Sequence, residues 1–300
     1  MKKSVSLLLA ALMLTGALAG CGSSASTSAG AQDSSAADTG VSGAVTVISR
    51  EDGSGTRGAF VELTGVEEKN ADGQKVDNTT ADAEIANKTD VVLTSVAGNE
   101  KAIGYISLGA LNDTVKAVKV DGAEATVDNV KNGSYKLSRP FNIATKGEPT
   151  GVAKDFINFI LSKDGQAVVT DNKYIAVDDA AESFVSDGSS GQIAVGGSSS
   201  VSPVMEKLIE AYKSVNPNAS IDLQTSDSTS GMTGAMDGTF DIGMASRELK
   251  DEEAAQLTGT AIALDGIAVI VNPANTIDEL SMDQIKSIYV GDITDWGDLA

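Results

Sequence analysis

The stretch IAVGGSSSVSP, residues 193–203, joins a short apolar segment to a helix through a loop of glycine and serine. Ile193–Val195 is predicted to be a strand, and the apolar spacing that follows predicts a helix over about 204–215. The N-terminus of a helix presents unpaired N–H groups and a partial positive charge. This unit therefore predicts an α/β fold and a candidate anion site at the loop.

Two other loops repeat the pattern. Residues 50–57, REDGSGTR, follow a predicted strand at Ala44–Ser49 and precede a predicted helix at Gly58–Leu63. Residues 225–232, TSDSTSGM, follow a predicted strand at Ile221–Gln224 and open another helix. Serine and threonine are also ordinary helix caps, so one such loop is weak evidence. Three of them, one beginning with arginine, indicate an oxyanion site, because the arginine fork donates two parallel hydrogen bonds.

The rest of the chain continues the alternation of strands and helices, which predicts an α/β protein with parallel or mixed sheets. Further strands are expected at Val91–Ser95, Ile103–Ser107, Val115–Val120 and Ala261–Val271, and further helices at Val152–Leu161 and Met282–Tyr289.

Composition excludes several classes of function. The 300 residues include 22 Lys plus Arg, 42 Asp plus Glu, no His and one Cys, with a net charge of −20. So acidic a chain is a poor nucleic-acid binder, and without histidine there is no Ser-His-Asp catalysis. There is no P-loop, no G-x-S-x-G elbow and no cluster of metal ligands. We therefore expect neither an enzyme nor a cofactor nor a metal.

The N-terminus predicts export and lipid anchoring. Residues 1–20 are predicted to be a signal peptide, because a basic start precedes an apolar run at Val5–Leu18. This run is too short for a secure membrane span. The run ends in LAGC, which resembles a bacterial lipobox and makes Cys21 the lipidation site. Residues 21–43, the lipidated cysteine with a Ser/Ala/Gly-rich segment, are expected to form a flexible tether. The protein should sit on the extracytoplasmic face of the plasma membrane.

Seven stretches of the chain carry a resemblance to one family. They are VISREDGSGTRGAF (47–60), AIGYISLGAL (102–111), residues 137–169, VGGSSSVSPVMEKLIEAY (195–212), STSGMTGAMDGTFDIGMASRELKDEE (228–253), ALDGIAVIVNP (263–273) and QIKSIYVGDITDW (284–296). Together they resemble the phosphate-binding proteins of bacterial ABC importers. The resemblance implies a solute-binding lipoprotein that captures inorganic phosphate between two lobes and delivers it to the membrane permease subunits.

The order of these stretches departs from the family's usual one. In the family the GSSSV segment comes first and the SREDGSGTR segment follows the ITDW segment, whereas this chain begins at SREDGSGTR and ends just after Trp296. The resemblance therefore implies a circularly permuted chain, with the family's usual ends joined through a linker at 184–192. Termini that lie close together at a surface make such a permutation tolerable.

The implied fold is a type II periplasmic-binding-protein clamshell, in which two lobes are joined by two crossover strands. One lobe is expected to combine 44–111 with 267–300, and the other to be continuous over 112–266 with the internal linker. The crossovers are expected near Gly109–Thr114 and Leu264–Val269. A monomer is expected.

The family's phosphate ligands can be carried over residue by residue. Asp52 matches an acid that orients the arginine. Ser246 stands where family members have an aspartate that accepts the ligand's proton, so rejection of sulfate stays open, and Asp227 is a hypothetical substitute acceptor. Arg247 either reaches the cleft or pairs at its rim. The implied phosphate-binding residues are Arg50, Ser54, Gly55, Thr56, Ser199, Ser200, Ser228 and Ser246.

Two alternatives stay open from the sequence. The site could bind another oxyanion such as sulfate or molybdate. The scaffold could also serve a surface lipoprotein without a transport role, or a hydrolase, which phosphatase turnover would reveal.

Overall fold

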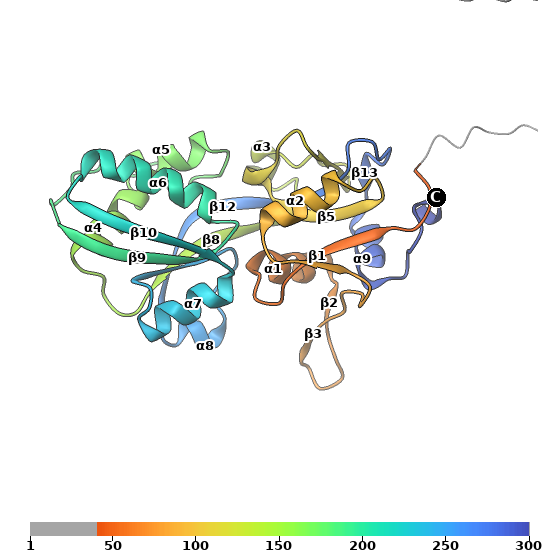
Figure 1. Ribbon diagram of the computed structural model, residues 1–300, viewed down its shortest axis with the longest axis horizontal. Coiled ribbons are helices and arrows are strands. Elements are labelled where there is room, and N and C mark those ends of the chain that lie inside the picture. Colours follow the sequence, from red (N-terminus) through yellow and green to blue (C-terminus); the bar gives the residue numbers. More distant parts are fainter. Residues whose placement is uncertain (1–40, 300) are drawn as a thin grey trace, which may run out of the picture. The chain divides into compact units, whose positions relative to one another are not determined.

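The computed structural model describes residues 41–299 (Figure 1). The predicted signal peptide, Cys21 and nearly all of the expected tether lie outside the described residues. Within 41–299, none of the helices has the length and apolar character needed to cross a membrane.

A mixed sheet of nine strands organises the described chain, in the order β10-β9-β11-β8-β12-β5-β1-β4, with β6 paired to β12. Strand β8 is antiparallel to both of its neighbours, β11 and β12, and β12 is antiparallel to β5. Toward the edges of the sheet, β9 is parallel to β10 and β11, and β1 is parallel to β5. The bounds are β1 Thr46–Arg50, β4 Glu84–Ala86, β5 Ala102–Ser107, β6 Lys116–Ala117, β8 Ser138–Thr145, β9 Gly191–Ser198, β10 Ala219–Ser226, β11 Ile242–Ala245 and β12 Thr258–Val271.

Helices cover the sheet, with α4, α5 and α6 on one face of β9 and β10 and with α7 and α8 on the other (Figure 1). Three helices end at a glycine in the left-handed region, namely Gly65, Gly238 and Gly291, where a side chain would be strained. The helices are α1 Gly55–Thr64, α2 Thr89–Ala97, α3 Val127–Lys131, α4 Gly151–Leu161, α5 Lys163–Asp171, α6 Ser202–Val215, α7 Ser228–Asp237, α8 Asp251–Ala254 and α9 Met282–Val290.

Smaller elements complete the fold. A hairpin of β2 and β3 follows α1, and the short strands β7 and β13 pair with each other. Their bounds, with those of two 3-10 turns, are β2 Glu67–Lys69, β3 Lys75–Asp77, β7 Lys119–Val120, β13 Glu279–Leu280, η1 Leu108–Ala110 and η2 Trp296–Leu299.

Two large hydrophobic cores form on the shared sheet. The first is centred on Phe60, whose ring stacks on Tyr105 with centroids 3.9 Å apart. The second is centred on the rings of Phe156, Phe159 and Tyr212. Burial of such rings dominates core energetics, so each half of the sheet holds its own packed interior.

The division of the chain between the cores differs from the expected lobes. Val115, Val130 and Leu137 pack in the first core, so the crossover expected near Gly109–Thr114 is wrong. The reason is that β6 adds to β12 on the side of the first core, which keeps the following residues there. The chain instead changes core where β8 begins. Strand β12 changes core between Ala263 and Leu264, at the start of the range expected for the second crossover.

Two expected strands also differ. Residues 91–95 lie in helix α2, because Val92, Leu93 and Val96 face the first core at helical spacing while Val91 is exposed. An apolar run this short does not distinguish a strand from a helix. Residues 115–120 hold two short strands, β6 and β7, which pair with different partners.

Candidate anion-binding site

Each of the three predicted loops leads from a strand into the first turn of a helix. Strand β1 leads into α1, β9 into α6 and β10 into α7. Helices α1 and α7 begin earlier than expected, at Gly55 and Ser228, so residues assigned to the loops form their first turns. Ser54 caps α1 by accepting a hydrogen bond from the Arg57 N–H, and Asp227 caps α7 in the same way.

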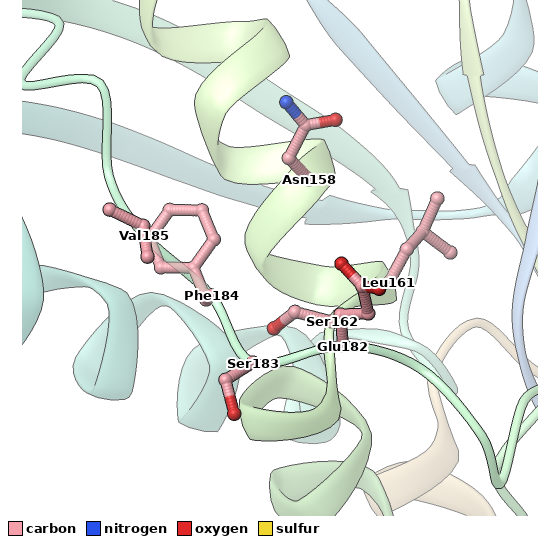
Figure 2. A pocket seen from close by; sticks show the side chains of 7 residues that line it. All are labelled: Asn158, Leu161, Ser162, Glu182, Ser183, Phe184 and Val185. Carbon is pink, nitrogen blue, oxygen red and sulfur yellow. The ribbon is translucent and has the colours of Figure 1, made fainter.

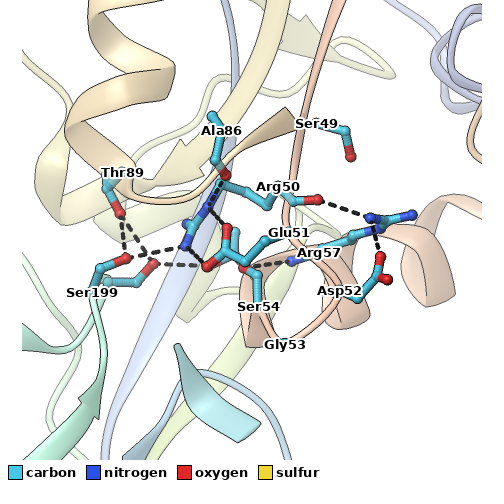
Figure 3. A network of polar contacts seen from close by, with 12 residues as sticks. Ser49, Arg50, Glu51, Asp52, Gly53, Ser54, Arg57, Ala86, Thr89 and Ser199 are labelled. Atoms are coloured by element: carbon cyan, nitrogen blue, oxygen red, sulfur yellow. Dashed lines mark hydrogen bonds and ion pairs between the residues drawn. The ribbon is translucent and has the colours of Figure 1, made fainter. Parts of the chain in front are cut away.

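Side chains from the two halves of the sheet meet at these helix N-termini (Figure 3). Arg50 Nη2 donates to Ser199 Oγ at 3.1 Å, and Thr56 Oγ1 lies 2.8 Å from Ser200 Oγ. All four residues are buried. The loop after β1 therefore closes directly onto the loop after β9.

Ser246 and Ser228 join the same cluster. Ser246 Oγ lies 3.4 Å from Thr56 Oγ1 and accepts from Ser198 Oγ at 3.0 Å. The Ser246 N–H donates to Ser228 Oγ at 3.1 Å. Gly55 packs against them, because a Cβ there would lie 2.4 Å from Ser228 Oγ. The structure thus brings the eight implied ligand residues together, with Ser54 present as the cap of α1.

Arg50 is oriented by Glu51 and not by Asp52. Its Nε and Nη2 each donate to the Glu51 carboxylate at 2.8 Å, and Nε also donates to the Ala86 carbonyl at 3.2 Å. The Asp52 side chain is 97% exposed and pairs with Arg57 at 2.7 Å. The expected role of Asp52 is therefore corrected, because the turn after β1 directs its side chain outward. Its partner Arg57 donates to the Arg50 carbonyl at 2.9 Å and to the Asp77 carboxylate at 2.8 Å.

Arg247 forms a buried pair with Glu253, whose carboxylate accepts from Nη1 at 2.7 Å and from Nη2 at 2.8 Å. Burial opposes ionisation of Glu253, but the hydrogen bonds from Arg247 and from the Lys250 N–H hold the pKa of this carboxyl below its ordinary value. The aliphatic part of Arg247 lies against Gly55 of α1. Arg247 therefore borders the cluster with its charge already paired.

Asp227 is engaged as a helix cap. Its Oδ1 accepts from the Ser230 N–H at 2.9 Å, and its Oδ2 accepts from the Ser230 hydroxyl at 2.5 Å. Gly53 lies against this carboxylate, and its carbonyl accepts from the Thr229 N–H at 3.1 Å. These contacts tie the loop after β1 to the start of α7.

Sequence reasoning missed two members of the site. Ser198 donates to Ser246, and Thr89 Oγ1 lies 3.4 Å from Ser199 Oγ. Thr89 opens α2, so a fourth helix N-terminus faces the cluster. The signal was present in the sequence, since threonine followed by aspartate ahead of an apolar run is typical of a helix start.

Other features of the described chain do not match an anion site. A surface pocket of about 390 Å³ is lined by Asn158, Leu161, Ser162 and residues 182–185 (Figure 2). None of these residues belongs to the three loops, and the only charged one is Glu182. Residues 41–299 also contain no group of three or more His, Cys, Asp or Glu side chains arranged to hold a metal.

Comparison with known proteins gives consistent matches. The PBP superfamily domain matches residues 25–164 and 183–300. A protein of Streptococcus agalactiae named phosphate-binding protein PstS 2 is 50% identical over 301 residues, which cover 99% of this chain and 98% of that protein. The Bacillus subtilis phosphate-binding protein PstS is 36% identical over 139 residues, 45% of this chain and 42% of that one.

A solved structure agrees along the chain. The crystal structure of a phosphate-binding protein of a phosphate ABC transporter from Streptococcus pneumoniae has a TM-score of 0.69 and 49% identity. The match covers 86% of this chain and all of that one.

Proposed function

Because this chain belongs to the family of bacterial phosphate-binding proteins PstS, within the PBP superfamily, we propose that it captures inorganic phosphate at the cluster around Arg50. It then delivers the phosphate to the permease subunits of an ABC importer on the extracytoplasmic side of the membrane. Its relatives are named as binding proteins, and we propose that this chain likewise catalyses no reaction.

The observation that carries the proposal is the convergence of a buried arginine and hydroxyl groups at several helix N-termini. A tetrahedral oxyanion needs donors from several directions, and Arg50, Thr56, Ser199 and Ser200 approach from both halves of the sheet. Hydroxyl hydrogens rotate, so groups that now bond to one another can turn toward a ligand. Backbone N–H groups and helix dipoles add positive potential without a net charge.

Calorimetric titration of the phosphate-free protein with phosphate tests this function. We expect saturable binding, and we expect Arg50→Gln to weaken it by roughly 10- to 100-fold, the usual effect of losing a hydrogen bond to a charged group. Lys163→Gln removes the same charge on α5 and should leave binding unchanged. A folded wild-type protein that binds no phosphate would contradict the proposal.

A broader oxyanion receptor is a second candidate, favoured by the chemistry around Ser246. Among residues 41–299, no carboxylate hydrogen-bonds to the hydroxyls of Ser198, Ser199, Ser200, Thr56 or Ser246. A hydroxyl can donate to a fully ionised sulfate as well as accept from a protonated phosphate. Titration with sulfate distinguishes the candidates: affinity close to that for phosphate supports the broad receptor, and much weaker affinity supports a phosphate-specific one.

The anchoring of the protein is part of the proposal. Lipidation of Cys21 would hold the monomeric binding domain at the outer surface of the plasma membrane, since an acyl chain adds roughly 0.8 kcal/mol of membrane affinity per buried CH₂. Replacing Cys21 by serine should release the protein from the membrane fraction. Retention of the variant in that fraction would count against the anchor.

We also propose that the chain is circularly permuted relative to family members with the usual order of segments, and that the full-length S. agalactiae relative shares the permuted order. The order of segments supports this, as does the coverage of the relatives: the S. agalactiae protein matches end to end, whereas the B. subtilis protein matches over less than half. A chain rearranged to start at Gly191, continue from 299 into 44 and end near 183 should fold and bind phosphate. Failure of that chain to fold would contradict a simple permutation.

A further inference from the structure

A third buried arginine lies where the two cores meet. Arg139 is the second residue of β8, where the chain passes from the first core to the second. It lies directly opposite Asp265 of β12, next to the point where β12 changes core. The two side chains are 2% and 0% exposed, and Arg139 Nη2 lies 3.2 Å from Asp265 Oδ2. This ion pair therefore occupies the junction between the halves that carry the anion cluster.

The pairing of Arg139 is incomplete. Arg50 and Arg247 each make two contacts of 2.8 Å or less with their own acid. In contrast, Nε, Nη1 and Nη2 of Arg139 have no hydrogen-bond acceptor among the described residues, and Asp265 Oδ2 has no donor. A buried guanidinium with unsatisfied donors retains more of its field than one locked in a bidentate pair.

Neighbouring strands connect the Arg139–Asp265 pair to both sides of the anion-site cluster. Strand β8 pairs with β11, whose last residue precedes Ser246. On the other side, Ser107 of β5 pairs with β12 two residues beyond Asp265. Two residues before Ser107, the Tyr105 hydroxyl accepts from the Arg50 N–H at 3.1 Å. Burial lowers the pKa of Arg139 to about 10, and repulsion from Arg50 adds to this, which agrees with their proximity.

We propose that Arg139 is an electrostatic positioning residue of the anion site, whose buried charge stabilises the bound anion from a distance, and that Asp265 sets how much of this charge the anion experiences. This inference rests on the proposed function of the site. Arg139 need not touch the ligand, because a charge in a poorly solvated interior acts over several ångströms with little screening.

Protonation of Asp265 is a second way to change how much of the Arg139 charge is offset. Burial raises the pKa of Asp265 to about 6, even though attraction to Arg139 favours the ionised form. Besides Arg50, the other ionisable groups that influence the Arg139–Asp265 pair are Tyr174 and Tyr105. Burial raises the pKa of both hydroxyls, so they stay protonated. At pH 8 Asp265 is therefore charged and offsets Arg139, whereas at pH 5 it is neutral.

Phosphate titration of the full chain and its variants at pH 8 tests the proposal. Asp265→Asn should tighten binding by roughly 5- to 20-fold, because it removes a negative charge that opposes the anion within a poorly solvated interior. Arg139→Gln should weaken binding by a similar factor. The double variant removes both the positive and the negative charge, so its phosphate affinity should be close to that of the wild type. Lys131→Gln, which removes an exposed charge on α3, should have no effect.

Repeating the comparison at pH 5 separates charge from structure. There the wild-type Asp265 is itself protonated, so Asp265→Asn should match the wild type. Weaker phosphate binding by Asp265→Asn than by the wild type at pH 8, or a double variant that binds more weakly than both single variants, would show a structural role and overturn the proposal. Should Asp265→Asn fail to fold, unchanged affinity of Arg139→Gln would overturn it alone. If the wild type binds no phosphate, the proposed function itself fails, which is a distinct result.

Discussion

Thr56 Oγ1 lies 2.8 Å from Ser200 Oγ, although 144 positions separate the two residues along the chain. Thr56 belongs to the first turn of α1, which packs on the first core, and Ser200 follows β9 of the second. The candidate anion site is therefore assembled only while the two halves touch. Hinge closure of two domains around a ligand is a known way to build such a site.

Gly55→Ala should hinder this contact. An added Cβ would lie 2.4 Å from Ser228 Oγ and 2.9 Å from Ser246 Oγ, so α1 must move away from the second half. We expect phosphate affinity to fall by about tenfold or more, since overpacking of this kind costs about 1–3 kcal/mol. Calorimetry measures the change.

Gly58→Ala provides the matched control for that experiment. Its Cβ would lie 3.8 Å from Arg247 Cδ, an ordinary contact, and alanine is the better residue inside a helix by about 0.5–1 kcal/mol. Affinity should be retained and stability slightly increased. Equal losses in the two variants would show that Gly55 has no special role.

Glu51→Gln and Asp52→Asn should differ in stability. Glu51 holds the buried Arg50 through two hydrogen bonds, so its replacement should lower the free energy of unfolding by about 1–3 kcal/mol. Asp52 makes a surface pair with Arg57, and such pairs contribute about 0–1 kcal/mol. Urea unfolding at neutral pH compares them, and a larger loss for Asp52→Asn would restore the orienting role first expected for that residue.

The Arg247–Glu253 pair should make stability depend on pH. Since the pKa of Glu253 is lower in the folded protein than in the unfolded chain, the pair stabilises the fold above about pH 4.3. This contribution is lost as the pH falls through the folded pKa. Glu253→Gln should cost about 3–5 kcal/mol at pH 7, because it leaves a buried charge unpaired, and should reduce the loss of stability on acidification. Unfolding curves at pH 7 and pH 3 measure both effects.

Asp155 should anchor the segment at 184–192. Its carboxylate accepts hydrogen bonds from Ser186 Oγ, the Asp187 N–H and the Tyr212 hydroxyl at 2.7, 3.0 and 2.8 Å. Asp155→Asn should destabilise the protein by about 1–3 kcal/mol and speed proteolysis of the segment. Asp187→Asn is the control, because its backbone donor is unchanged. Identical proteolysis of the two variants would contradict the anchoring role.

Local features of the sequence predicted much of the fold. The glycine- and serine-rich loops at 50–57, 196–203 and 225–232 do lead from strands into helices, and their residues do meet. Such loops are recognisable because capping and helix initiation depend on residues within one turn of each other. The family resemblance likewise depends on short stretches of sequence, and the full-length relatives confirm it.

Only the tertiary structure decided the remaining features. Arg50 pairs with Glu51 and not with Asp52 because the turn after β1 exposes the Asp52 carboxylate and directs the Glu51 carboxylate toward the guanidinium. Residues 91–95 form a helix because one face of that run packs on the first core. Residues 115–137 stay with the first core because β6 pairs with β12, far along the chain. In the second and third cases the packing partners are remote in sequence, so their contribution arises only when the cores form. In the first case the partner is a sequence neighbour, and the conformation of the turn decides which of two adjacent carboxylates meets the guanidinium.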